Sequence, residues 1–162
     1  MLGGILFVDR NVYYYIHQLT KEDLRFFNKE QEQRINQAEA YAALLMIQAG
    51  AEHLEGHDCT LYVDNSAAEG TLTKAYSKSP FLTAIAGEFW TMVMKHNIGI
   101  YVDRVPTSEN ITDPLSRGEL LVAKLLGATK LKVVMPSPSK WGFLVNKEGT
   151  KRHKAVKKAR VA

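Results

Sequence analysis

Cysteine is nearly absent from this sequence, since Cys59 is the single one among 162 residues. One thiol cannot form a disulfide within the chain, which excludes a disulfide-stapled scaffold and indicates an intracellular, reducing compartment. Long apolar stretches are also absent, because none reaches the roughly 20 residues that a membrane-spanning helix needs. Residues 1–7 lack the basic start and the small-residue cleavage site of a signal peptide. We therefore expect no membrane partner and an intracellular location, with the compartment left open.

The composition of the chain fits one folded domain. The chain is 46% hydrophobic and contains seven tyrosines, which excludes a wholly disordered protein and allows a sizeable core. We expect this domain over residues 1–132. Residues 133–162 form an extended Pro-containing segment followed by a basic tail.

The positive charge is concentrated in that tail. The net charge of the chain is +4, but residues 147–162 carry +6 and the rest carries −2. Such a cationic arm suits RNA phosphates, whose neutralisation releases counterions, and a merely solvated tail is the alternative. The residues predicted to bind nucleic acid are Lys147, Lys151, Arg152, Lys154, Lys157, Lys158 and Arg160.

The central stretch of the sequence is LYVDNSAA at residues 61–68. Its β-branched and aromatic residues favour a strand that stops at Asp64. Asn65 or Ser66 can cap a following helix with a side-chain oxygen. Asp64 would then lie at the carboxyl end of a strand, where open α/β sheets place their chemistry. The alternative is that Asp64 only terminates the strand.

Two strand-like runs joined by a turn predict a β-hairpin at the N-terminus. Residues 3–8 and 12–18 favour strands, and the DRN sequence at 9–11 has turn chemistry. Of the three tyrosines at 13–15, we expect one ring to pack inward, with a base-stacking surface as the alternative. The other predicted elements are a helical turn over 20–28, helices over 36–52, 80–96 and 114–126, and a strand over 98–103.

Three carboxylates lie near the ends of predicted elements in this mixed α/β arrangement. Glu39 lies early on the first long helix, Asp64 at a strand end, and Asp113 where a loop enters the last predicted helix. Carboxylate oxygens suit Mg²⁺, and two such ions can clamp the attacking and leaving oxygens of a phosphodiester. Glu39 could equally be a surface residue favoured by the amino end of its helix.

Three segments resemble the motifs of the RNase H domain of retroelement reverse transcriptases, in the same order and with similar spacing. They are residues 35–44 (INQAEAYAAL), 63–68 (VDNSAA) and 105–119 (VPTSENITDPLSRGE). The resemblance runs from about residue 3 to residue 132 and implies a ribonuclease H-like mixed sheet flanked by helices. In that family the matching carboxylates bind two magnesium ions and cut the RNA strand of an RNA–DNA hybrid. The resemblance therefore gives catalytic and metal-ligand roles to Glu39, Asp64 and Asp113.

The resemblance begins at the second strand of the family fold. The first strand of the family ends in a metal-binding Asp and lies in the middle of a five-stranded sheet, whereas residues 3–7 (GGILF) resemble the strand after it. We therefore expect the central strand to be missing from these residues, with unpaired backbone groups left beside it. Asp9 lies in the predicted turn and does not replace the missing Asp. Thr112 stands where the family usually has Ala, and residues 104–112 contain no His.

Two functions follow from the resemblance. In the first, a retroelement-derived domain has lost hybrid cleavage, its carboxylates are relics that need no cofactor, and it is an RNA-associated structural component of a larger ribonucleoprotein such as a mitochondrial ribosome. A partner chain would supply or cover the central strand. In the second, the chain is part of a split, Mg²⁺-dependent RNase H whose partner supplies the first Asp. We favour the first, because losing one ligand weakens a two-metal site. A protein–protein module is a third alternative.

Overall fold

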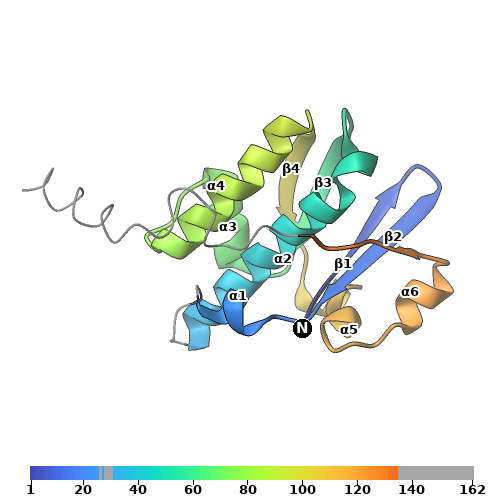
Figure 1. Cartoon of the computed structure of the whole chain (residues 1–162), viewed down its shortest axis with the longest axis horizontal. Coiled ribbons are helices and arrows are strands. Elements are labelled where there is room, and N and C mark those ends of the chain that lie inside the picture. The colour runs from blue at the N-terminus through green and yellow to red at the C-terminus, as the bar shows by residue number, and fades with distance from the viewer. Residues whose placement is uncertain (26, 28–30, 135–162) are drawn as a thin grey trace, which may run out of the picture.

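The computed structural model describes residues 1–25, 27 and 31–134, and it is a mixed α/β arrangement of two small sheets and several helices (Figure 1). The strands are β1 (Leu2–Val8), β2 (Asn11–His17), β3 (Asp58–Val63), β4 (Gly99–Arg104) and β5 (Thr129–Lys130). The α-helices are α1 (Lys21–Arg25), α2 (Gln31–Leu54), α3 (Ser66–Lys74), α4 (Pro80–Lys95), α5 (Asp113–Ser116) and α6 (Leu121–Leu125). A 3₁₀ turn, η1, spans Thr107–Glu109. The predicted α/β class is confirmed at this level.

The N-terminal hairpin is confirmed, with a two-residue turn. β1 and β2 pair antiparallel, from Leu2 opposite His17 to Val8 opposite Asn11. Asp9 lies in the turn with φ of 53° and is exposed, as expected for a turn residue. Of the three tyrosines, Tyr15 is the fully buried one, and its hydroxyl donates to the carbonyl of Ala42 at 2.7 Å. The inward-packing interpretation of this run is therefore correct for one ring.

Helix α2 is the central element of the core. It begins five residues before the predicted start at 36 and ends two residues after the predicted end at 52. It packs against the hairpin, α3, α4 and β3. Its buried residues recur at helical spacing and include Ala40, Tyr41, Ala43, Leu44, Leu45, Met46, Ile47, Ala51 and Leu54. Both sheets and the helices α3 and α4 therefore pack against this one helix.

The second sheet is the parallel pair β3–β4. Asn65 caps α3, because its side-chain oxygen accepts a hydrogen bond from the N–H of Ala68 at 2.8 Å. Ser79 caps α4, and Pro80 is the first residue of that helix, where a missing N–H costs nothing. These caps fix the helices that connect β3 to β4.

The predicted last helix over 114–126 is wrong. The chain forms two short helices, α5 and α6, and Gly118 between them has φ of 82°, which interrupts a right-handed helix. Leu115 of α5 is fully buried against β1, where a Cβ on Gly3 would lie 2.6 Å from the Cβ of Leu115. The break at Gly118 thus lets α5 pack on the hairpin while α6 follows a separate direction.

No helix within the described ranges is long and apolar enough to cross a membrane. The predicted basic tail, including Lys147, Lys151, Arg152, Lys154, Lys157, Lys158 and Arg160, lies outside the described residues.

Candidate functional site

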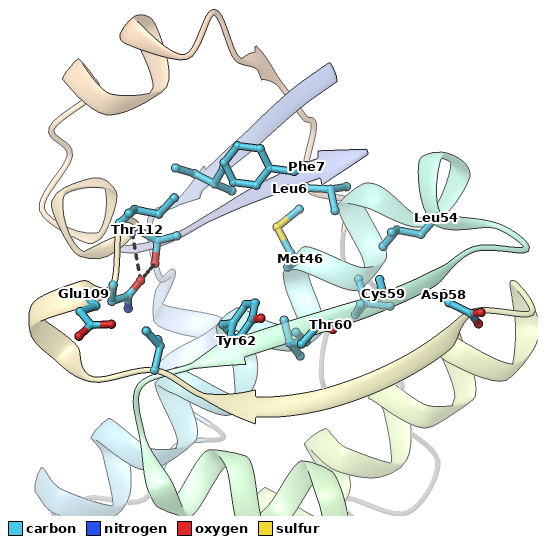
Figure 2. A pocket seen from close by; sticks show the side chains of 16 residues that line it. Leu6, Phe7, Met46, Leu54, Asp58, Cys59, Thr60, Tyr62, Glu109 and Thr112 are labelled. Carbon is cyan, nitrogen blue, oxygen red and sulfur yellow. Dashed lines mark hydrogen bonds between the residues drawn. The ribbon is translucent and has the colours of Figure 1, made fainter. Parts of the chain in front are cut away.

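The two sheets are separate, and a cleft of about 600 Å³ lies between strands β1 and β3 (Figure 2). One wall is residues 5–7 of β1 and the other is residues 58–62 of β3. Residues from α2 form the floor, where the side chain of Met46 lies between the two strands. The lining residues are Ile5, Leu6, Phe7, Met46, Ile47, Leu54, Asp58, Cys59, Thr60, Leu61, Tyr62, Val105, Glu109, Asn110, Ile111 and Thr112.

Glycines allow β1 to approach the helix beneath this cleft. A Cβ on Gly50 of α2 would lie 2.7 Å from Cδ2 of Leu6. A Cβ on Gly4 would lie 2.6 Å from Cε1 of Tyr15 and 2.9 Å from Sδ of Met46. Contacts of this length are shorter than packed carbon and sulfur atoms tolerate, so neither glycine accepts a side chain without a shift of its neighbours. The floor is consequently apolar and closely packed.

The three predicted carboxylates gather at one end of the cleft. Glu39 from α2, Asp64 from the end of β3 and Asp113 from the start of α5 line one hollow of about 300 Å³. Gly3 at the start of β1 lines the same hollow. The prediction that these carboxylates come together is therefore correct, although they come from segments far apart in the sequence.

Glu39 shows the electrostatic consequence of this arrangement. Burial raises the pKa of Glu39 to about 7, and the negative charges of Asp64 and Asp113 and a hydrogen bond with Asp64 act in the same direction. A carboxylate in water ionises well below neutral pH. Glu39 is therefore half protonated near neutral pH, and the interpretation of Glu39 as a simple surface residue is wrong.

Asn110 orients the second carboxylate of the cluster. Its Nδ2 donates to Oδ2 of Asp64 at 3.0 Å. Its Oδ1 accepts from the N–H of Thr112 at 3.0 Å and from Oγ1 of Thr112 at 2.7 Å. Thr112, the departure from the usual family residue, thus holds the amide that contacts Asp64. We did not identify Asn110 as a site residue from the sequence, although it lies within the third motif.

Asp113 has a cationic partner of its own. Nη1 of Arg117 donates to Oδ2 of Asp113 at 2.6 Å, and Nε of Arg117 donates to Oε1 of Glu119 at 3.2 Å. The hydrogen bonds that Arg117 donates to both carboxylates raise its pKa, with the Glu119 bond making the larger contribution. The negative charge of Asp113 is therefore partly balanced by Arg117.

The carboxylates, as they stand, do not form a metal-chelating group. Within the described part of the chain, no set of three or more His, Cys, Asp or Glu side chains is placed so that it could hold one ion. Magnesium binding by Glu39, Asp64 and Asp113 stays a prediction of the resemblance.

The outer side of the two sheets exposes aromatic side chains beside the cleft. Phe7 of β1 is 55% exposed, and Tyr62 of β3 is 63% exposed. Tyr101 of β4 is 66% exposed. Helices cover the other side of the sheets, where Tyr15 and Val63 are buried. The cleft thus opens toward a partly aromatic surface, away from α2.

Comparison of the chain with protein-family models, with curated proteins and with solved structures finds no match. The fold class is therefore stated from the structure alone, and the RNase H resemblance rests on the three sequence motifs.

Proposed function

We propose that this chain is a retroelement-derived, RNase H-like domain that does not cleave nucleic acid by itself and serves as an RNA-associated structural component of a ribonucleoprotein. The observation that carries the proposal is the position of the three motif carboxylates. Glu39, Asp64 and Asp113 meet at the end of a cleft between two unjoined sheets. The resemblance requires a central strand with a fourth carboxylate at this place.

Without a cation, the electrostatics of the cluster favour the protonated form of Glu39. A site built for two cations needs ionised carboxylates, because the charged form is the metal ligand. The pKa of Glu39 is raised to about 7, chiefly by burial and then by the neighbouring carboxylates. A proton on Glu39 lowers the repulsion among the three carboxylates, as a bound cation would also do.

The RNA association is supported by charge. The tail over residues 147–162 carries seven of the 21 Lys and Arg residues of the chain against a single Glu. Phosphate contacts by such an arm are independent of sequence and weaken as salt concentration rises. A ribosome, such as a mitochondrial one, is the kind of particle that this proposal fits.

A second candidate function is supported by the same geometry. The hollow lined by Glu39, Asp64 and Asp113 shares Asn110 and Thr112 with the cleft, so a partner strand that ends in Asp could bring a fourth carboxylate to the cluster. The pair would then be a split, Mg²⁺-dependent RNase H acting on RNA–DNA hybrids.

Purification of the native protein under mild salt, with identification of bound RNA and protein, tests the first function against the second. We expect recovery of a large ribonucleoprotein, and a charge-neutral tail variant is the control that should lose it. Recovery of one small partner with an Asp-ended strand, together with hybrid cleavage by the pair, would favour the split nuclease. Recovery of neither RNA nor a nuclease partner would overturn both.

A further inference from the structure

Among the described residues, no strand pairs with the edge of β1 that borders the cleft. Its other edge pairs with β2, and Ile5 lies opposite Tyr14. The carbonyl of Tyr14 accepts from the N–H of Leu131, on the far side of β2, so Ile5 and Tyr14 form one of the pairs that turn their backbone groups outward. By alternation, Gly3, Ile5 and Phe7 direct their N–H and C=O groups toward the cleft.

Strand β3 presents the opposite edge. The carbonyl of Val63 accepts from the N–H of Val105, and the carbonyl of His57 accepts from the N–H of Gly99, both on the β4 side. Alternate residues of a strand point their backbone groups to opposite edges. Residues 58, 60 and 62 therefore direct their N–H and C=O groups toward the cleft, facing those of β1 (Figure 2).

We propose that this cleft takes an extended strand of a partner polypeptide, with apolar side chains at alternate positions, which joins the two sheets into one. A polypeptide backbone is the chemistry that matches two facing rows of amide donors and carbonyl acceptors. The seven residues of β1 and the six of β3 set its length. This inference rests on the proposed function in one respect, because that function makes the partner a separate chain.

The two faces of the cleft determine the side chains of this strand. On the inner side it meets Leu6, Met46 and Leu54, so residues pointing inward must be apolar. On the outer side it passes between the exposed rings of Phe7 and Tyr62, which accept apolar or mixed side chains. A nucleic acid strand would place its charged phosphates against this apolar floor, where their burial is unfavourable.

The test uses the full chain and a synthetic peptide, capped at both ends, that alternates valine with threonine over about seven residues. Hydrogen exchange is measured at the amides of Ile5, Phe7, Thr60 and Tyr62. We expect exchange to slow at least tenfold at these amides when peptide is added, and alkylation of Cys59, which lines the cleft, to slow with it. The same peptide with every second amide N-methylated keeps one hydrogen-bonding edge, so it should protect the amides of β1 or of β3 but not both pairs.

A pair of variants isolates the β3 edge. Thr60→Pro removes an N–H that faces the cleft and leaves the β3–β4 hydrogen bonds in place, whereas Thr60→Val keeps it. We expect Thr60→Pro to weaken peptide binding at least tenfold and Thr60→Val to bind like the parent chain. The N-methylated peptide gives the same information if Thr60→Pro fails to fold.

Several results would overturn the inference. Unchanged exchange at millimolar peptide, or equal protection by the N-methylated peptide, would exclude pairing with both edges. Slow exchange of the four amides without peptide, at every protein concentration, would mean that this chain fills its own cleft. Protection that grows with protein concentration alone would identify a second copy as the occupant. Because no nucleic acid is present, these results are distinguishable from a failure of the proposed RNA association.

Discussion

Glu39 and Asp64 lie close enough that the charge of Asp64 and a hydrogen bond with it help to raise the pKa of Glu39 to about 7, in addition to the effect of burial. Glu39 lies in the first half of α2, and Asp64 directly follows the last residue of β3. The charge of Asp64 makes ionisation of Glu39 costly, because like charges at short range repel in a partly desolvated site.

Glu39→Gln should remove a pH dependence of stability. The folded chain holds the Glu39 proton up to a pKa of about 7, whereas the unfolded chain releases it near its ordinary value. The contribution is therefore fully present below about pH 4 and is lost as pH rises to about 7, and it amounts to on the order of 3 kcal/mol. Denaturant unfolding at several pH values should show Glu39→Gln gaining stability over the parent above pH 7. The exposed Glu52→Gln, on the same helix, is the control and should leave the pH profile unchanged.

Asn110→Ala should destabilise the fold by about 1–3 kcal/mol, because it removes three hydrogen bonds and leaves Asp64 without its amide donor. The neighbouring Glu109→Ala changes an exposed side chain and should fall within about 0.5 kcal/mol of the parent. Denaturant midpoints measure both. Equal midpoints for the two variants would show that the Asn110 contacts do not hold the third motif in place.

Gly4→Ala should cost about 1–3 kcal/mol, since the added Cβ meets the Tyr15 ring at 2.6 Å and Met46 at 2.9 Å beneath the cleft. Gly70→Ala is the matched control, because a Cβ at Gly70, inside α3, meets no atom within 4 Å. That control should stabilise the chain by about 0.5–1 kcal/mol through helix propensity. Thermal unfolding should therefore move the two midpoints in opposite directions, and a stabilised Gly4→Ala would mean that the floor of the cleft is loosely packed.

Removal of residues 147–162 should weaken RNA binding and flatten its salt dependence. Seven cations on single-stranded RNA give a slope of log affinity against log salt of up to about −5. Fluorescence anisotropy over a range of salt concentrations measures this slope. A tail of the same composition in shuffled order is the control and should keep the slope, because phosphate contacts do not depend on tail sequence. An unchanged slope in the deletion would give the tail another role.

Local patterns in the sequence predict much of the fold. Strand-like runs around the turn at 9–11 predict the hairpin, and helical spacing predicts α2 and α4. The DNS sequence after β3 predicts a cap at Asn65 or Ser66, and Asn65 is the residue that caps α3. The last helix is mispredicted, because the apolar spacing on both sides of Gly118 looks continuous while the positive φ of that glycine separates α5 from α6. The two-residue β5 is too short to leave a pattern.

The candidate site is predicted in its residues but not in its chemistry. The motif resemblance correctly brings Glu39, Asp64 and Asp113 together. The raised pKa of Glu39 and the hydrogen bond from Asn110 to Asp64 depend on burial and on contacts between distant segments. The spacing of residues along the sequence does not predict such contacts. The separate sheets likewise follow from tertiary packing around α2.

The most direct test of the central claim is to incubate the pure chain with a fluorescent RNA–DNA hybrid and with the matching single-stranded RNA, with and without Mg²⁺, and to record binding and cleavage in the same samples. Asp64→Asn and the exposed Glu52→Gln serve as variants. We predict salt-dependent binding that both variants retain, with no cleavage under any condition. Mg²⁺-dependent cleavage of the hybrid that Asp64→Asn abolishes and Glu52→Gln retains would contradict the proposal and make this chain a nuclease.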